Sequence, residues 1–266
     1  TISILSLMAW GLGYCGQPHI LVRFMAIGNP KDLAKARNIG ITWMIFTVGG
    51  ALLVGLVGIA YMMKFDQTTM LKFDGSKTEA ETIFIYFSRV LFHPLVGGFL
   101  LSAILAAVMS TISSQLLVTS SSLTEDIYKA FIKKDATPKQ LLTASRLSVL
   151  IVAVIAVLLS LTPKDSILNL VGNAWAGFGS AFGPVIIFSL FWRKTTWQGV
   201  LAGMLIGGSV VLAWVYLDHP FKDWYEMIPG FFSSVIAIYV VSLLTQKPNK
   251  EIDKEFDEMK AVLKEN

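Results

Sequence analysis

The chain has 266 residues, of which 54% are hydrophobic and 15% are charged, and its mean hydropathy is +0.63. A soluble domain carries about 25% charged residues, so this composition excludes an ordinary soluble protein and indicates several spans of a lipid bilayer. Basic residues in short loops beside such spans explain the net charge of +4 without a nucleic-acid partner. The single cysteine, Cys15, excludes an internal disulfide and a cysteine-based metal cluster.

The first apolar segment, residues 2–27, is rich in residues that weaken a helix. Its centre reads WGLGYCGQPHI, where three glycines precede Pro18. Glycine and proline inside a span free backbone groups, which a membrane tolerates only where they line a cavity or meet protein. An interrupted span of this kind is the best sequence indication of a transporter site. We therefore expect a break in the helix near residues 11–16.

Three residues of this segment, Trp10, Tyr14 and Pro18, recur every four positions and share a stripe if the helix persists. Trp and Tyr combine a flat apolar surface with a hydrogen-bond donor, which suits a small amphipathic solute. An interfacial aromatic belt or plain packing is the alternative interpretation of the same pattern.

The rest of the chain predicts further helices in order. A short basic loop at 29–39 precedes a second span at 40–63, and a mixed-charge loop at 64–93 contains an amphipathic surface helix at 79–92. Thr137-Pro138 predicts the start of a later helix. Five more spans, making seven in all, are expected at about 94–122, 140–161, 166–191, 196–217 and 227–246. The charged tail 247–266 predicts a short cytoplasmic helix or disorder.

Hydroxyl groups crowd the stretch from Ala103 to Asp126, AILAAVMSTISSQLLVTSSSLTED. Ala107, Ser110 and Thr111 stand at i, i+3 and i+4, so a backbone carbonyl and two hydroxyls can converge on one point. Oxygens without a carboxylate suit a weakly held monovalent cation, because divalent sites usually recruit carboxylates. Alternatively, these hydroxyls bond back to the i−4 carbonyls and help helices to pack.

Charge and motif patterns restrict orientation and chemistry. Basic residues concentrate in the loops at 29–39, 123–146 and 192–195, which the positive-inside rule places in the cytoplasm. The sequence has no Gly-rich phosphate loop, HExxH or GxSxG motif, so we do not expect an enzyme. No acidic residue lies in the centre of a span, which favours sodium over protons as a coupling ion.

Three blocks of the sequence resemble the sodium–solute symporter family: WGLGYCGQPHILVRFMA, LLSAILAAVMSTISSQLLVTSSSLTEDIYKAF and NAWAGFGSAFGPVIIFSLFW. The resemblance covers nearly the whole chain and is strongest to the proline-transporting members, from which Cys15 and Asn173 depart. It implies an all-α membrane protein with a leucine-transporter-like inverted-repeat fold. The implied transmembrane bundle, 1–246, holds the second repeat at about 1–191 and extra helices at about 196–246, followed by the cytoplasmic tail, 247–266.

The same resemblance implies a function. The family suggests a secondary active transporter that imports L-proline with sodium across the cytoplasmic (inner) membrane, with a cytoplasmic C-terminus. It implies that sodium binds the Ala107 carbonyl and the Ser110 and Thr111 hydroxyls. It also implies that the substrate contacts Trp10, Tyr14 and Pro18.

Alternatives to proline import stay open. They are sodium-coupled symport of another small solute (an amino acid, a monocarboxylate or a sugar) and, less favoured, the membrane module of a sensor protein. In the family the other sodium ligands come from the first helix of the first repeat. We therefore expect the chain to be the C-terminal part of a longer protein, whose missing N-terminal half is needed for a complete site.

Overall fold

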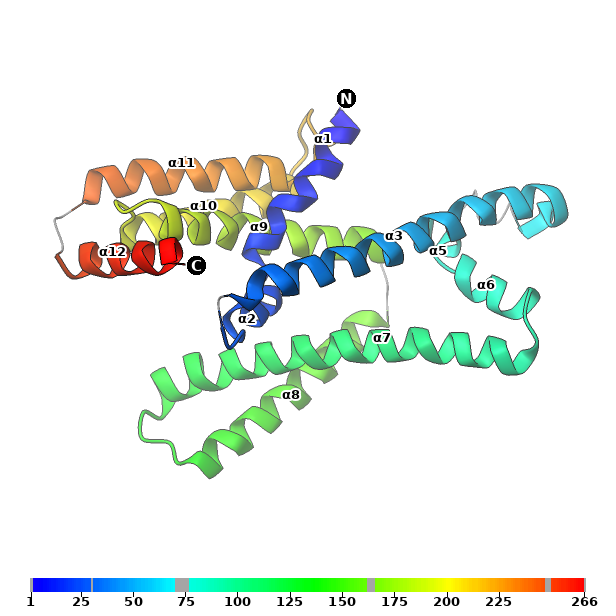
Figure 1. The fold of residues 1–266 in the computed structure, drawn as a ribbon, viewed down its shortest axis with the longest axis horizontal. Helices are drawn as coiled ribbons and strands as arrows, with labels where there is room; N and C mark the ends of the chain where they lie inside the picture. The colour runs from blue at the N-terminus through cyan, green and yellow to red at the C-terminus, as the bar shows by residue number, and fades with distance from the viewer. Residues whose placement is uncertain (1, 30, 70–76, 162–165, 247–249, 266) are drawn as a thin grey trace. The chain divides into compact units, whose positions relative to one another are not determined.

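A computed structural model describes residues 2–29, 31–69, 77–161, 166–246 and 250–265. Within these ranges the regular structure is entirely helical (Figure 1), which confirms the predicted all-α fold class. The chain forms two compact units, residues 1–35 with 167–266 and residues 36–166. Each unit is described by itself.

Six helices of the described chain are long and apolar enough to cross a membrane. They are α3 (Asp32–Phe65), α7 (Pro94–Ser121), α8 (Pro138–Ser160), α9 (Ile167–Phe191), α10 (Trp197–Tyr216) and α11 (Met227–Thr245). They correspond to six of the seven predicted spans. The predicted first span consists of shorter pieces, α1 (Ile2–Ala9), the 3₁₀ helix η1 (Trp10–Gly16) and α2 (Pro18–Met25).

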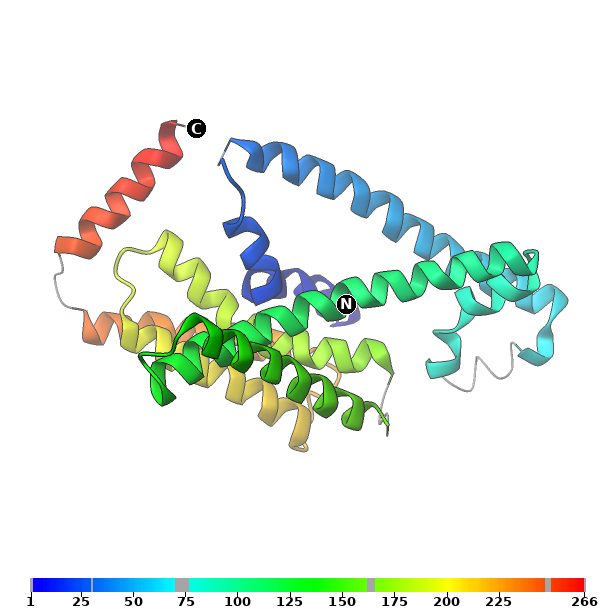
Figure 2. The ribbon, with the colours of Figure 1, turned by 90° about the horizontal axis from the view of Figure 1, so that it is seen from below.

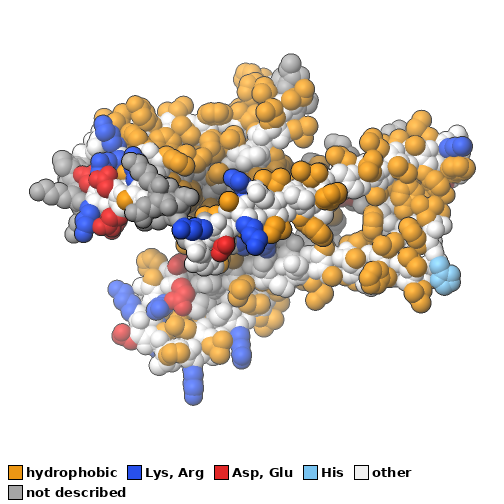
Figure 3. All heavy atoms as spheres, viewed as in Figure 1, with side chains coloured by type: hydrophobic (Ala, Val, Ile, Leu, Met, Phe, Trp, Pro, Cys, Tyr) orange, Lys and Arg blue, Asp and Glu red, His pale blue; other side chains and the backbone are white. Residues whose placement is uncertain are grey.

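Apolar side chains cover the outer faces of the long helices, and charged side chains gather near helix ends (Figure 3). Phe99 on α7 and Leu205 on α10 are examples, with 74% and 62% of their surface exposed. Such exposure would be unfavourable in water but is neutral in lipid, whose tails are as apolar as leucine. The surface therefore agrees with the membrane class predicted from composition.

In the first unit, α9, α10 and α11 lie side by side (Figures 1 and 2) and pack through small residues. A Cβ atom on Gly207 of α10 would lie 2.5 Å from the Ser180 carbonyl oxygen of α9. A Cβ atom on Gly230 of α11 would lie 2.6 Å from the Ser180 hydroxyl. Close backbone approach at small residues is the usual way in which membrane helices associate. The three helices are therefore closely packed, and their shared core includes Val211 and Phe231.

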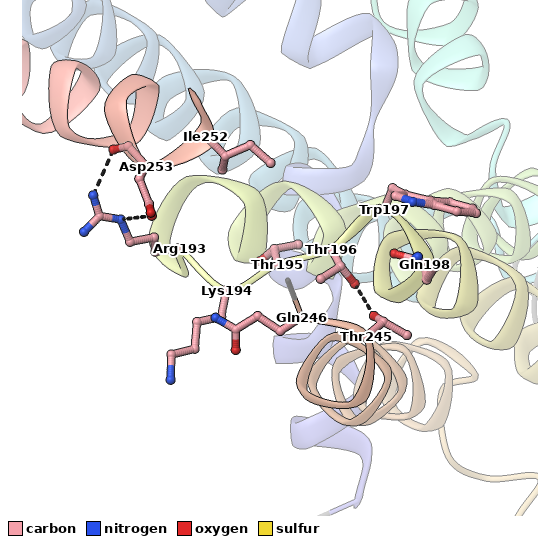
Figure 4. A pocket seen from close by; sticks show the side chains of 10 residues that line it. All are labelled: Arg193, Lys194, Thr195, Thr196, Trp197, Gln198, Thr245, Gln246, Ile252 and Asp253. Atoms are coloured by element: carbon pink, nitrogen blue, oxygen red, sulfur yellow. Dashed lines mark hydrogen bonds and ion pairs between the residues drawn. The ribbon is translucent and has the colours of Figure 1, made fainter. Parts of the chain in front are cut away.

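The predicted tail is a helix, α12 (Lys250–Glu265), which contacts the turn after α9. The Arg193 guanidinium forms an ion pair with Asp253, with 2.8 Å between Nε and Oδ1, and donates from Nη2 to the Asp253 carbonyl oxygen at 2.8 Å. Figure 4 shows this pair beside a pocket of about 400 Å³, on whose other side the Thr196 and Thr245 hydroxyls lie 2.7 Å apart. Arg193 therefore ties the charged tail to the turn that joins α9 to α10.

In the second unit, α7 and α8 lie side by side (Figures 1 and 2). The buried Ser120 hydroxyl lies 3.0 Å from the Ser145 carbonyl oxygen and 2.8 Å from the Ser145 hydroxyl. The helix continues past α7 as the π-helix η2 (Ser122–Ile132). The expected start of α8 is confirmed, because Thr137 and Gln140 form a reciprocal capping box around Pro138.

Two boundaries differ from the prediction. Helix α3 begins at Asp32, so the expected loop at 29–39 is wrong beyond residue 31. The Asn29 side chain accepts a hydrogen bond from the Lys31 amide at 3.0 Å, and an acidic first turn suits the positive end of the helix dipole. The surface helix expected at 79–92 is split into α5 (Lys77–Ala80) and α6 (Ile83–Val90).

Helix α6 packs on α3 through Gly58. A Cβ atom on Gly58 would lie 2.8 Å from Ile83, and the Phe87 ring lies 5.4 Å from the Tyr61 ring. The Tyr86 hydroxyl donates to the Asp66 carboxylate at 2.7 Å, just beyond the end of α3. This bond, with others from Thr69 and Thr68, lowers the pKa of Asp66 below its ordinary value of 3.8, and it raises the pKa of Tyr86 to about 12.

Candidate functional site

The predicted break in the first span is present. Regular α-helix ends at Ala9, and the 3₁₀ helix η1 carries the chain to Gly16. Gln17 then adopts an extended conformation, with φ −89° and ψ 112°, before Pro18 starts α2. A 3₁₀ segment inside a helical span often marks a functional hinge, and proline at the first helical position loses no hydrogen bond.

The break packs against α9 through glycine-to-backbone contacts. A Cβ atom on Gly16 would lie 2.6 Å from the Phe178 carbonyl oxygen and 2.8 Å from Gly179 Cα. A Cβ atom on Gly179 would in turn lie 2.7 Å from Gly13 Cα. These separations are shorter than ordinary carbon contacts of about 3.5–4.0 Å, so only glycine permits this approach. Two of the three glycines that predicted the break therefore also place it on α9.

An aromatic cluster of Trp10, Tyr14, Trp175 and Tyr225 lies at this contact. The Trp10 ring is stacked on Trp175 at 5.5 Å between centroids and on Tyr225 at 6.0 Å. Tyr14 meets the Trp175 ring edge to face at 4.9 Å. Such arrangements are favourable pairings of aromatic side chains. Two residues of the predicted stripe are thus brought together by a residue of α9.

Hydrogen bonds fix the same cluster. The Trp175 indole Nε1 donates to the Trp10 carbonyl oxygen at 3.0 Å, and the Gln17 side-chain amide donates to the Trp175 carbonyl oxygen at 3.1 Å. The Tyr225 hydroxyl donates to the Gly172 carbonyl oxygen at 2.8 Å. A backbone carbonyl at the break therefore has a protein partner, which is one way in which a membrane span tolerates freed backbone groups.

The predicted sodium ligands lie on α7 in the second unit. The Thr111 hydroxyl donates to the Ala107 carbonyl oxygen at 3.2 Å, so two of the three predicted oxygens are neighbours. Ala107, Ser110 and Thr111 are all exposed within their unit. The bond from Thr111 to Ala107 has the i−4 geometry of the packing alternative, and Ser113 makes the same kind of bond to Met109 at 2.7 Å. Among the described residues no group of three or more His, Cys, Asp or Glu could hold a metal ion.

Comparison with known proteins identifies the family. The model of the Sodium:solute symporter family matches residues 1–207. The chain belongs to the sodium:solute symporter family.

Its relatives in this family include bacterial proline transporters. The chain is 54% identical over 264 residues to the "Osmoregulated proline transporter OpuE" of Bacillus subtilis and 52% identical over 273 residues to "Sodium/proline symporter 2" of Staphylococcus saprophyticus. It is 50% identical over 258 residues to the "High-affinity proline transporter PutP" of Bacillus subtilis. These matches cover 97–99% of the chain but 52% of each relative, so the chain spans about half their length. No solved structure matches the chain.

Three further residues at the break, Trp175, Gln17 and Tyr225, were not indicated by the sequence alone. Trp175 lies in the block NAWAGFGSAFGP, which carried the family resemblance but gave no indication of its partner on η1. Pro18 starts α2 as expected for a break. Asn173, two residues before Trp175, lines a different hollow of about 380 Å³ between α9 and α10. The Asn173 and Trp175 side chains therefore lie on different faces of α9.

Proposed function

We propose that the protein carrying this chain is a secondary active transporter that imports L-proline with sodium across the cytoplasmic membrane. The observation that carries the proposal is the broken helix, whose residues Trp10 and Tyr14 both pack against Trp175. The names of the relatives supply the expected solute and coupling ion. A Gly/Pro-interrupted span with aromatic side chains is the kind of element around which such transporters bind solute.

In this proposal Trp10 and Tyr14 bind the apolar ring of proline, although the break means that they no longer share one helical stripe with Pro18. Tyr14 is 43% exposed while one edge contact ties it to Trp175, so its hydroxyl and the rest of its ring are free to meet a solute. Trp10 offers an apolar edge, and Pro18 sets the turn between the two helical pieces. Loss of one polar contact whose partner stays buried costs about 1–3 kcal/mol, or roughly 5- to 150-fold in affinity.

Sodium is a co-transported substrate that the Ala107 carbonyl and the Ser110 and Thr111 hydroxyls would contact. This set fits a monovalent ion, because it has several neutral oxygens and no carboxylate. The 3.2 Å separation of the Ala107 and Thr111 oxygens supports the fit, since rotation of one hydroxyl frees both. We assign the remaining ligands to a part of the transporter outside this chain.

The topology of the proposal follows loop charge. We place the basic segments at 29–39, 123–146 and 192–195, which include helix ends, and the C-terminus in the cytoplasm. Residues 1–246 then form the transmembrane bundle, with the second repeat at about 1–191 and extra helices at about 196–246. Residues 247–266 form the cytoplasmic tail. The protein catalyses transport and no chemical reaction.

The test is uptake of radiolabelled proline by liposomes that contain the purified full-length protein. We expect uptake driven by an inward sodium gradient and none from an equal potassium gradient or a proton gradient alone. An excess of another amino acid, a monocarboxylate or a sugar should not compete. If sodium drives uptake of one of those competitors but not of proline, the substrate of the transporter is that competitor and not proline.

A further inference from the structure

We propose that Trp175 of α9 is a positioning residue of the substrate site, which holds Trp10 and Tyr14 in place across the broken helix. The substrate readout rests on the proposed proline transport, but the positioning itself can be measured without substrate. Trp175 acts through its neighbours and need not touch the solute.

Trp175 is tied to both ends of the break. Its indole N–H bonds to the carbonyl of Trp10, the first residue of η1, at 3.0 Å. Its backbone carbonyl accepts from Gln17, the residue directly after η1, at 3.1 Å. Gln17 is only 3% exposed, so loss of this bond would leave a buried amide without its partner. One residue of α9 therefore spans the whole 3₁₀ segment.

The helix geometry of η1 makes such a partner necessary. In an α-helix, residues four apart lie on nearly the same face, but a 3₁₀ helix has about three residues per turn. Residues 10 and 14 are then separated by about a third of a turn, so η1 alone does not align their rings. Trp175 brings them together, because its ring meets Trp10 nearly parallel, at 16°, and Tyr14 nearly perpendicular, at 81°.

The indole fits closely against the backbone of the break. A Cβ atom on Gly13 would clash with the Trp175 indole, including Cδ1 at 2.5 Å. The helix that carries Trp175 is itself held in place, because the adjacent Ala176 is fully buried. The Gly172 carbonyl of the same helix also accepts the Tyr225 hydroxyl. A rigid helix and a large, hydrogen-bonded ring are what a positioning residue requires.

The variant that tests this role is Trp175→Phe, which keeps an aromatic ring and removes the indole N–H. The matched control is Trp214→Phe in the same unit, which removes an indole bond to the Trp224 carbonyl of 3.2 Å. For Trp175→Phe we expect the KM for proline to rise about 5-fold or more. Its maximal rate and its half-saturating sodium concentration at saturating proline should change little. The control should leave all three values unchanged.

A second readout does not need proline. Cys15 is exposed within η1, so its labelling rate by a maleimide, followed on the peptide that contains it, reports the conformation of the break. Trp175→Phe should change this rate several-fold, and Trp214→Phe should not. If the unmodified protein takes up no proline, the proposed function fails while the labelling result still decides the positioning role.

Unchanged proline KM and unchanged Cys15 labelling in folded Trp175→Phe protein would overturn the inference. If that variant does not yield folded protein, Gln17→Leu is the second test. It removes only the hydrogen bond from Gln17 to the Trp175 carbonyl and keeps a side chain of similar size. The same rise in KM and the same change in labelling are then expected. Wild-type values for Gln17→Leu would equally overturn the role of Trp175.

Discussion

Replacement of Gly16 by alanine perturbs the contact between the broken helix and α9 with the smallest possible change. The new Cβ would lie 2.6 Å from the Phe178 carbonyl oxygen, 2.8 Å from Gly179 Cα and 2.8 Å from the Gly183 amide nitrogen. All three atoms belong to the backbone of one helix, so no side chain can rotate to relieve the clash. Either η1 or α9 must move.

The magnitude follows from overpacking. A carbon contact is ordinary at about 3.5–4.0 Å, so the three contacts fall short by about 0.7–1.4 Å each. Overpacking of a well-packed site costs about 1–3 kcal/mol, and rigid backbone partners place Gly16→Ala near the upper limit. About 3 kcal/mol corresponds to roughly a 150-fold change in an equilibrium constant.

Gly11→Ala is the matched control. It adds the same methyl group to the same 3₁₀ helix, but its Cβ would have nothing within 4 Å. Both variants share the loss of unfolded-state freedom, which stabilises by about 0.4–1 kcal/mol. The difference between the two variants therefore isolates the clash.

The first assay is thermal unfolding of the detergent-solubilised full-length protein, monitored by size-exclusion chromatography. The second is the KM for proline. We expect Gly16→Ala to lower the midpoint by several degrees and to raise KM, and Gly11→Ala to keep the unmodified KM with an equal or slightly higher midpoint. Equal midpoints and equal KM values for both variants would refute the packing of η1 on α9.

Two further predictions concern the second unit. Thr111→Ala and Ser110→Ala should each raise the sodium concentration for half-maximal uptake, whereas Ser113→Ala, which loses only a bond to a helix carbonyl, should not; equal sodium dependence in all three would make the hydroxyls structural. Because the pKa of Asp66 is lowered and that of Tyr86 is raised to about 12, their contact stabilises fully from about pH 4 to about pH 10. The difference in unfolding midpoint between unmodified and Tyr86→Phe protein should thus be constant from about pH 5 to 9 and shrink below about pH 4; a difference that grows in acid would contradict the assignment.

The break was predictable because its cause is local. A helix is weakened, wherever it packs, by the glycines and the proline within eight consecutive residues: Gly11, Gly13, Gly16 and Pro18. The bond between Thr111 and Ala107 was likewise implied by i, i+4 spacing. Local spacing also predicted the capped start of α8.

The partners of the break were not predictable from one sequence. Trp175 lies 165 residues from Trp10 along the chain, and only tertiary packing places the indole on that carbonyl. The early start of α3 was missed for a different reason. Charged residues from Asp32 onward suggested a loop, although a helix can continue into water when an acidic residue in its first turn suits the helix dipole. Hydropathy marks the apolar part of such a helix and not its ends.

The most direct test of the substrate site is the equilibrium affinity for proline at saturating sodium, measured on the unmodified full-length protein, Tyr14→Phe and Trp10→Ala. We predict that both variants bind proline more weakly, by roughly 5- to 150-fold, and that Tyr14→Phe alters sodium binding less than proline binding. Unchanged proline affinity in both variants would contradict the account and leave the aromatic cluster with a packing role alone.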